Sequence, residues 1–197
     1  MKITIAKEQI ISGLQAVQNI VGSRTTLPIL SNVLLSAEDN KLSLTATDLD
    51  VTVSCSVEAN VERPGSTTVP VKRLFGIVRE LPTEEIDLEV DDKNTCSLKS
   101  GEAFYKINGL PAEEYPPLPT FKENQSLSLP QEKIKNMLRR TSFAISNDET
   151  RYVLNGIFLS IKEDKLMMVA TDGRRLALAE EEITSETTAE FIVPTKA

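Results

Sequence analysis

The sequence predicts an α+β fold in which a β-α-β-β-β unit recurs along the chain. In some segments apolar residues occupy every second position, which is typical of strands. In others they recur at spacings of three and four, which is typical of helices. Residues 30–48 also match residues 154–172 without a gap, at an offset of 124 positions. Such self-similarity at a domain-sized period indicates a duplication.

Further segments match in the same register. They are Val69-Pro70-x-Lys72 with Val193-Pro194-x-Lys196, then Glu8, Ile10 and Leu14 with Glu132, Ile134 and Leu138, and lastly Ile3 and Ile5 with Leu127 and Leu129. Apolar positions fall on apolar positions throughout these pairs. A chance match does not explain several segments in one gapless register.

The first copy is expected to hold two β-α-β-β-β halves. Residues 2–6 alternate as a strand, and residues 7–21 carry one apolar helical stripe that ends at Gly22. Strands are then expected over residues 29–37, 41–47 and 51–59. After a turn at 63–66 the same order recurs, with Pro70 at a helix start: a strand over 67–69, a helix over 72–81, and strands over 86–90, 95–99 and 103–108.

The second copy begins after a proline-rich, polar segment at residues 111–119, which is either an interdomain connector or a capping loop. A strand is expected over 126–129, a helix over 131–146, and strands over 152–161, 165–171, 175–181 and 189–193. Ala197 corresponds to Arg73 of the first copy, so the second copy is present only to the start of its second helix. We therefore expect one domain over residues 1–120 and the first part of a second over 121–197, in a fragment of a longer protein.

Composition narrows the class of protein. The chain has 197 residues, 40% hydrophobic residues, a net charge of −7 and no histidine. It has no apolar run of about 18 residues, so we expect no membrane span and a cytoplasmic location. Cys55 and Cys96 lie in alternating segments and are expected to be reduced core residues. The acidity argues against a simple basic nucleic-acid-binding module.

No catalytic constellation is visible. The sequence contains no Walker loop and no GxGxxG, GxSxG, HExxH or CxxC motif. Thr47-Asp48 and Thr171-Asp172 could suggest catalytic aspartates, but their recurrence at the repeat offset favours a shared turn in which Asp accepts backbone N–H groups. We therefore expect a protein that is not an enzyme, with no catalytic residue, metal ligand or cofactor.

The expected helices are more basic than the rest of the chain. Residues 131–146 carry Lys133, Lys135, Arg139 and Arg140 against one acid, Glu132, and the helix from residue 72 adds three further cations. Two interpretations stay open here. The cations solvate exposed helix faces, or they contact nucleic-acid phosphates without reading bases.

A second candidate site surrounds Leu154 and residues 171–176. Gly173 can adopt a positive φ, Leu154 and Leu176 offer apolar walls, and Arg174 and Arg175 offer a polar rim. Such a cleft could accept a short peptide anchor. The alternative is an ordinary hairpin turn with core leucines.

Several short motifs in combination resemble one family, the bacterial sliding clamps or β subunits of DNA polymerase III. They are Arg24 with residues 27–30, LTATD at 44–48, TVP at 68–70, GLP at 109–111, RYVLNG at 151–156 and VATDGRRLA at 169–177. The resemblance covers all 197 residues. It departs at Arg174, where the family often has histidine.

The resemblance implies a DNA-clamp fold. Family members have three similar domains, and two chains join head to tail as a ring, with helices lining a channel for duplex DNA and antiparallel sheets outside. It implies a DNA-facing set at Arg24, Lys72, Arg73, Arg79, Lys133, Arg139, Arg140 and Lys196. It implies a partner-peptide pocket at Leu154, Thr171, Gly173, Arg175 and Leu176, and a subunit interface at Tyr105 and Ile107.

The expected function is therefore that of a non-catalytic processivity factor. By resemblance, its partners are duplex DNA of any sequence, the DNA polymerase III catalytic subunit, the clamp loader and other proteins that carry a clamp motif, with a homodimer ring when full length. The alternative is a truncated peptide-binding adaptor that does not encircle DNA. The adaptor would bind motif peptides but would not load onto circular DNA.

Overall fold

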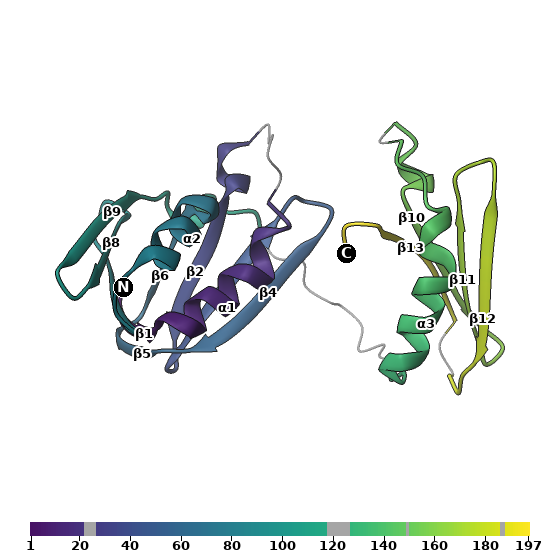
Figure 1. The fold of residues 1–197 in the computed structure, drawn as a ribbon, viewed down its shortest axis with the longest axis horizontal. Helices are drawn as coiled ribbons and strands as arrows, with labels where there is room; N and C mark the ends of the chain where they lie inside the picture. The colour runs from purple at the N-terminus through teal and green to yellow at the C-terminus, as the bar shows by residue number, and fades with distance from the viewer. Residues whose placement is uncertain (22–26, 118–126, 149, 186–187) are drawn as a thin grey trace. The chain divides into compact units, whose positions relative to one another are not determined.

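The computed structural model describes residues 1–21, 27–117, 127–148, 150–185 and 188–197. The chain divides into two compact units, unit 1 at Met1–Pro119 and unit 2 at Thr120–Ala197. The described residues form antiparallel sheets with α-helices packed against them (Figure 1), so the predicted α+β class is confirmed.

Unit 1 contains two α-helices and two sheets in its described residues. The elements are β1 (Lys2–Ala6), α1 (Lys7–Gln18), β2 (Asn32–Glu38), β3 (Lys41–Thr47), β4 (Thr52–Glu58), β5 (Asn60–Arg63), β6 (Gly65–Pro70), α2 (Val71–Glu80), β7 (Glu85–Val90), β8 (Thr95–Ser100) and β9 (Ala103–Asn108). This is the predicted order of two β-α-β-β-β halves, with β5 as an additional strand.

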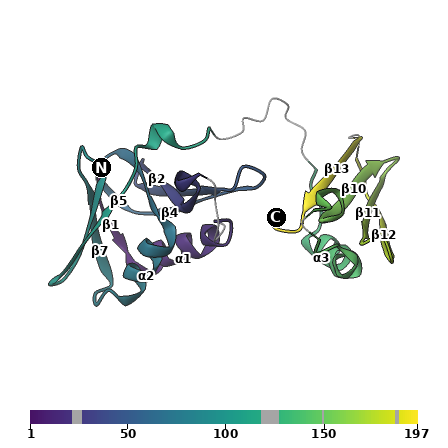
Figure 2. The ribbon, with the colours of Figure 1, turned by 90° about the horizontal axis from the view of Figure 1, so that it is seen from above.

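The two halves of unit 1 exchange their first strands. One sheet has the order β5-β1-β7-β8-β9 and the other β4-β3-β2-β6. Thus β1 of the first half pairs with β7 of the second, and β6 of the second half pairs with β2 of the first. Helices α1 and α2 lie side by side in both views (Figures 1 and 2) and bury one continuous core. The exchange makes the halves depend on each other for burial.

Gly13 sets how closely α1 approaches the sheet. A Cβ at this position would lie 2.8 Å from Leu44 Cδ1, and the Cys55 thiol lies 3.5 Å from the Gly13 carbonyl oxygen. A larger residue would therefore require the Leu44 side chain to move.

The expected strand over residues 51–59 is observed as β4, but an unpredicted strand follows it directly. The chain leaves one sheet at β4 and enters the other at β5, with Ala59 between them. Arg63, which we expected in a turn, is the last residue of β5 and pairs with Lys2. Strand β5 is polar at its exposed edge, so it lacks the apolar alternation that reveals a strand.

Unit 2 repeats α1 and the four-stranded sheet of unit 1 in its described residues. Its elements are α3 (Gln131–Thr141), β10 (Gly156–Lys162), β11 (Lys165–Thr171), β12 (Leu176–Glu182) and β13 (Ala189–Pro194), in the sheet order β12-β11-β10-β13. These four strands lie at an offset of 124 from β2, β3, β4 and β6 at both ends. Gly156 opposes Pro194 as Asn32 opposes Pro70, so the predicted register of the duplication is confirmed.

Two expectations for unit 2 are wrong. Residues 127–130 form no strand, whereas their counterpart β1 lies between β5 and β7 in unit 1. No counterpart of β7 is present among the described residues of unit 2, so this segment lacks the neighbour that would hold it extended. Residues 152–154 form a 3₁₀ helix before β10, as residues 28–31 do before β2.

Helix α3 covers one face of the unit 2 sheet (Figure 2) and contacts β11 and β12. It ends at Thr141, whose hydroxyl donates to the Met137 carbonyl oxygen, and a 3₁₀ turn at Ser142–Ala144 follows. The predicted helix over 131–146 is therefore shorter. Met137 of α3 belongs to one core cluster with Met168 of β11 and Ala179 of β12, and all three side chains are nearly inaccessible.

Candidate functional site

The same turn joins the counterpart strands β3–β4 and β11–β12. Asp48 Oδ1 accepts the N–H groups of Asp50 at 3.2 Å and Val51 at 2.8 Å. Asp172 Oδ1 accepts those of Arg174 at 2.9 Å and Arg175 at 3.0 Å. The Arg174 and Arg175 N–H groups lower the pKa of Asp172. The prediction of a shared turn is confirmed. The two carboxylates stabilise this turn by accepting backbone N–H groups.

The two turns differ at their positive-φ residue. Gly173 has φ +86°, as the sequence predicted, and its counterpart Leu49 has φ +81°. In both turns the preceding threonine hydroxyl bonds across the turn: Thr171 Oγ1 accepts the Gly173 N–H at 3.1 Å and donates to the Arg175 carbonyl at 2.7 Å. Unit 2 thus forms the turn without the backbone strain that unit 1 bears at a leucine.

Four of the five predicted pocket residues lie together at this turn. Thr171 ends β11, Leu176 begins β12 and is paired with it, and Gly173 and Arg175 lie between them. Leu176 is 65% exposed. Leu154, which is half-buried, ends the 3₁₀ helix before β10, and its carbonyl accepts the Ser146 N–H at 3.1 Å. Leu176 is therefore a surface residue and not a core leucine.

Two arginines border this turn. The Arg175 guanidinium carbon lies 5.7 Å from the centre of the Phe143 ring, and Arg175 Nε lies 3.0 Å from Asp172 Oδ2. A Cβ on Gly173 would lie 3.4 Å from Arg151 Nη1. A cation over an aromatic face and a carboxylate at its side fix the Arg175 side chain as a rim beside Leu176.

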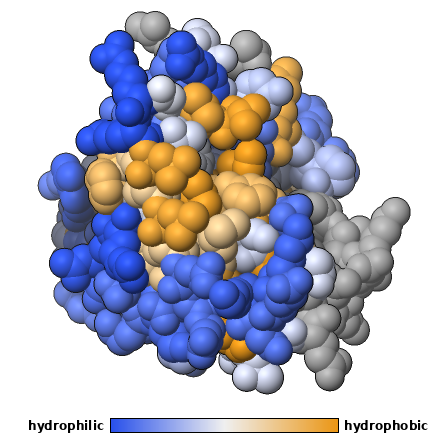
Figure 3. Space-filling model, turned by 90° about the vertical axis from the view of Figure 1, so that its right-hand side faces the viewer, coloured by the Kyte–Doolittle hydropathy of each residue, from blue (hydrophilic) through white to orange (hydrophobic). Residues whose placement is uncertain are grey.

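Sequence reasoning missed the apolar residues around Leu176. Register places Leu178, Val169, Phe158 and Ile192 in one row across the sheet, on the face opposite α3. Exposed Phe143, Tyr152 and Val153 belong to the segments before the sheet. Figure 3 shows an apolar area bordered by hydrophilic residues on the side of unit 2 that carries β11 and β12. Comparing the copies would have revealed this row, because three of its four counterparts, Ser54, Thr45 and Thr68, are polar.

The cations predicted to face DNA are exposed wherever the structure describes them. Lys72, Arg73 and Arg79 lie on α2, Lys133, Arg139 and Arg140 on α3, and Lys196 follows β13, whereas Arg24 lies outside the described residues. Acidic neighbours contact two of them. Arg79 Nε lies 2.9 Å from Glu80 Oε1, and Lys133 Nζ lies 4.0 Å from Glu181 Oε2.

Helix α3 is more basic than its counterpart α1. At the offset of 124, Lys133, Lys135 and Arg139 of α3 correspond to Gln9, Ile11 and Gln15 of α1. On α3 these side chains line a hollow of about 370 Å³ together with Glu132, Asn136 and Glu181. Arg139 and Arg140 lie in the last helical turn, where the helix dipole favours cations.

The two predicted interface residues differ in exposure. Both lie on β9, an edge strand of its sheet. Tyr105 is 44% exposed, but Ile107 is fully buried in the core of unit 1. The Ile107 side chain therefore packs inward, whereas the Tyr105 side chain is accessible at this edge.

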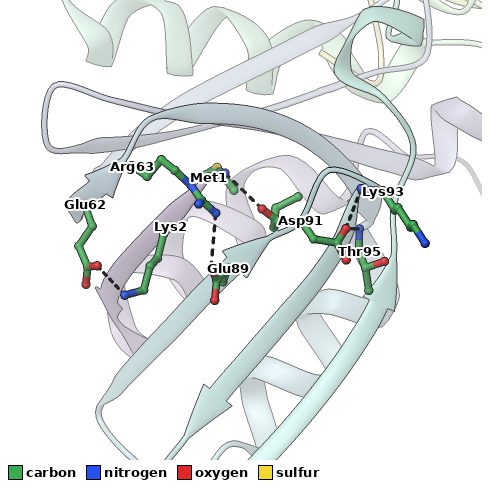
Figure 4. A network of polar contacts seen from close by, with 9 residues as sticks. Met1, Lys2, Glu62, Arg63, Glu89, Asp91, Lys93 and Thr95 are labelled. Carbon is green, nitrogen blue, oxygen red and sulfur yellow. Dashed lines mark hydrogen bonds and ion pairs between the residues drawn. The ribbon is translucent and has the colours of Figure 1, made fainter.

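The charged cluster at the start of unit 1 joins neighbouring strands (Figure 4). Lys2 Nζ lies 2.6 Å from Glu62 Oε2, and Arg63 Nη2 lies 3.4 Å from Glu89 Oε1. The Met1 amine donates to the Val90 carbonyl at 3.3 Å, and burial lowers its pKa. These contacts tie β1 to β5 and β7.

Other chemistry is sparse in the described part of the chain. No group of three or more Cys, Asp or Glu residues there could hold a metal ion, and none of its helices is long and apolar enough to cross a membrane. Both cysteines are free. Burial raises the pKa of Cys96 to about 12 and also raises that of Cys55, so both are poor nucleophiles.

Two family models match the chain. Residues 1–119 match the N-terminal domain of the DNA polymerase III beta subunit, and residues 128–197 match its central domain. Curated relatives include the beta sliding clamps of Chlamydia trachomatis, 36% identical over 100% of this chain and 48% of the relative, and of Pseudomonas aeruginosa, 38% identical over 100% and 54%.

Solved structures agree with this match. The Bacillus subtilis DNA polymerase sliding clamp superposes with a TM-score of 0.93 at 33% identity, over 100% of this chain and 54% of that one. A Bartonella birtlesii sliding clamp bound to griselimycin superposes with a TM-score of 0.89 at 40% identity, over 98% and 54%. The chain spans about half the length of these relatives.

Proposed function

Since this chain belongs to the family of bacterial DNA polymerase III beta subunits, we propose that it forms part of a sliding clamp that encircles duplex DNA. The clamp is a cytoplasmic, non-catalytic processivity factor. It tethers the polymerase and other partners through a peptide-binding pocket on unit 2 and needs no cofactor. In this proposal residues 1–120 are the first clamp domain and residues 121–197 the first part of the second.

The observation that carries the proposal is the apolar surface beside the β11–β12 turn. Leu176 is exposed between the Arg175 rim and the row that includes Leu178 and Val169. Its counterpart in unit 1 is Thr52, whose hydroxyl is hydrogen-bonded to that of Thr47. An exposed leucine with a fixed polar rim is suited to holding an apolar peptide side chain.

Griselimycin tests the pocket, because the Bartonella birtlesii relative binds it. We expect this chain to bind griselimycin and Leu176→Asp to weaken that binding by at least tenfold in calorimetric titration. Thr52→Asp is the matched control, since it places the same charge at the same position of the other copy. Equal loss in both variants, or none in Leu176→Asp, would contradict the pocket assignment.

Incomplete burial supports the proposed division into domains. Leu14 of α1 is fully buried, while its counterpart Leu138 of α3 is 38% exposed. Thr68 of β6 is fully buried, while its counterpart Ile192 of β13 is 41% exposed. In unit 1 the cover comes from α2 and from the segment after β9, and neither has a described counterpart in unit 2.

The exposed cations of α2 and α3 support the DNA role. A closed ring holds DNA by topology, so diffuse contacts to phosphates are sufficient and a net charge of −7 is compatible with sliding. These contacts involve Lys72, Arg73, Arg139 and Arg140, and we add Arg24, Arg79, Lys133 and Lys196 from the family pattern. In the homodimeric ring, the edge of β9 with Tyr105 faces the other subunit.

Retention on circular DNA tests this role. The protein to use is a chimera in which this chain replaces the matching half of the Bacillus subtilis clamp. We expect Arg139→Glu with Arg140→Glu to shorten retention of the loaded ring. The control, Lys41→Glu with Lys93→Glu, reverses two exposed charges that lie outside the helices and outside β9 and should leave retention unchanged. Unaltered retention of the helix variant would remove these arginines from the DNA role.

The adaptor alternative makes a different prediction for the same chimera. Griselimycin binding without any retention on circular DNA would favour an adaptor. One observation favours the adaptor. Arg79 and Lys133 form ion pairs with acidic residues, and these ion pairs reduce the positive charge available for phosphates.

A further inference from the structure

Tyr115 of unit 1 packs against a sheet that has a counterpart in unit 2. After β9 the chain crosses to the second sheet of unit 1, where Leu110 pairs with Thr68 of the edge strand β6 through two backbone hydrogen bonds of 3.0 Å. The 3₁₀ turn at Ala112–Glu114 then delivers Tyr115 to the face opposite α1, where it is buried.

The Tyr115 hydroxyl fills an opening between two strands. The pairing of β2 with β3 stops at Leu34 and Thr45, so Asn32 and Thr47 lie beyond it. The hydroxyl accepts the Thr47 N–H at 3.1 Å and lies 3.2 Å from the Thr45 carbonyl oxygen and 3.5 Å from that of Asn32. One phenol thus satisfies backbone groups that the ladder leaves behind.

Unit 2 contains the same opening. The pairing of β10 with β11 stops at Phe158 and Val169, the counterparts of Leu34 and Thr45. The atoms that correspond to the partners of the Tyr115 hydroxyl are the Thr171 N–H and the carbonyl oxygens of Val169 and Gly156. No described residue of unit 2 corresponds to Tyr115 at the offset of 124.

The surroundings of the opening in unit 2 are apolar. Phe158, Leu178 and Ile192 stand where unit 1 has Leu34, Ser54 and Thr68. Strand β13 is also an edge strand, as β6 is, so an incoming segment can pair with it at Ile192 as Leu110 pairs with Thr68. An aromatic ring with a hydroxyl fits such a site, because the ring covers apolar side chains and the hydroxyl reaches the backbone.

We propose that unit 2 carries a tyrosine socket, formed by the Thr171 N–H, the Val169 and Gly156 carbonyl oxygens and the apolar row around them. Its occupant is a tyrosine-bearing extended segment that follows unit 2 in the longer parent polypeptide. The internal repeat supports this source, because in unit 1 the segment after the domain's last strand supplies the tyrosine. The relatives extend to about twice the length of this chain. The inference rests on the proposed division into domains.

A peptide probe tests the socket. The probe is residues 109–117 of this chain, GLPAEEYPP, which carries Tyr115 in its natural context. Added to the ¹⁵N-labelled chain, it should shift the Thr171 amide resonance. The control peptide GLPAEEFPP lacks only the hydroxyl and should bind at least threefold more weakly. Equal affinity of the two peptides, or a shift that avoids residues 156, 169 and 171, would overturn the socket.

Two further arms separate the possible failures. The Leu176→Asp variant should bind the probe peptide as the unaltered chain does, because Leu176 contributes none of the three backbone groups. Griselimycin binding with no probe binding would therefore overturn the socket while the peptide pocket stands. In the chimera with the Bacillus subtilis clamp the socket should already be filled, so the probe should no longer shift Thr171. A persistent shift there would overturn the same-chain source and point to a separate partner.

Discussion

Units 1 and 2 share one strand register but differ in what covers their sheets. The strands β10–β13 repeat β2, β3, β4 and β6 pair for pair. Positions that are fully buried in unit 1, such as Leu14 and Thr68, are surface positions in unit 2. The register therefore follows from local alternation and turns, whereas burial depends on elements far away in the sequence.

The faces opposite the helices also differ in chemistry. In unit 1 hydroxyls pair across β3 and β4: Ser43 with Ser56 at 2.9 Å and Thr45 with Ser54 at 2.8 Å. In unit 2 the counterpart of the second pair is Val169 with Leu178. On this face of unit 1 the hydroxyl groups form hydrogen bonds with each other. On the same face of unit 2 an apolar row is accessible, and burying it would be favourable.

The largest expected effect tests the difference in burial. Leu14→Ala should lower the free energy of unfolding of unit 1 by about 2–5 kcal/mol, because it leaves a cavity in a closed core. Leu138→Ala removes the same atoms from a half-open site in unit 2 and should cost about 1 kcal/mol. Amide hydrogen exchange with residue resolution measures each unit separately. Equal costs would show that α3 is as fully packed as α1.

The next effect tests the opening in the sheet of unit 1. Tyr115→Phe keeps the ring but leaves the Thr47 N–H buried without its acceptor, which should cost about 1–3 kcal/mol. Exchange of the Thr47 amide should also accelerate relative to that of Leu44, a control on the same strand. A variant as stable as the unaltered chain would mean that water replaces the hydroxyl without loss.

A smaller effect tests the two turns. Leu49→Gly should stabilise unit 1 by up to about 1 kcal/mol, since relief of ~1–2 kcal/mol of left-handed strain exceeds the added chain entropy of ~0.5–1 kcal/mol. Gly173→Ala should destabilise unit 2, because the strain returns although the Cβ has room. Thermal unfolding of both variants checks the signs. A destabilising Leu49→Gly would show that the Leu49 side chain contributes more than its strain.

The smallest effect is the pH dependence that Asp172 gives to the stability of unit 2. The pKa of Asp172 lies below its ordinary value of 3.8, because the Arg174 and Arg175 N–H groups stabilise the carboxylate. Its contribution to stability is therefore present above about pH 4 and is lost as the pH falls through the lowered pKa. Asp172→Asn should flatten this part of the acid unfolding curve. An unchanged curve would mean that the turn does not depend on the carboxylate charge.

Much of this fold could be predicted from sequence because its signals are local. Apolar alternation located β3, β4 and β11, and the recurring Thr-Asp pair identified the shared turn. The division between β4 and β5 and the lost strand at 127–130 could not be predicted, since each depends on a pairing partner distant in sequence. The pocket residues at 171–176 came together because they lie in one turn. The row from Leu178 to Ile192 was missed because it forms only across strands.

Ile107 shows another limit of transferring residues from a family. The resemblance assigned it to a surface by position, but its side chain is fully buried in the core of unit 1. Tyr115 shows the converse. The connector in which it lies reads as a polar, proline-rich segment, and its role appears only when the two sheets of unit 1 are assembled.

The central claim is that the sheet face opposite α3 in unit 2 can bind a ligand, whereas the corresponding face of unit 1 cannot. Hydrogen exchange with and without griselimycin tests this claim most directly. We expect protection to appear over residues 171–178 of unit 2 and exchange to stay unchanged over residues 47–54 of unit 1. Protection over both segments would mean that the two faces are equivalent. Protection over neither, with binding intact, would place the peptide pocket elsewhere on the chain.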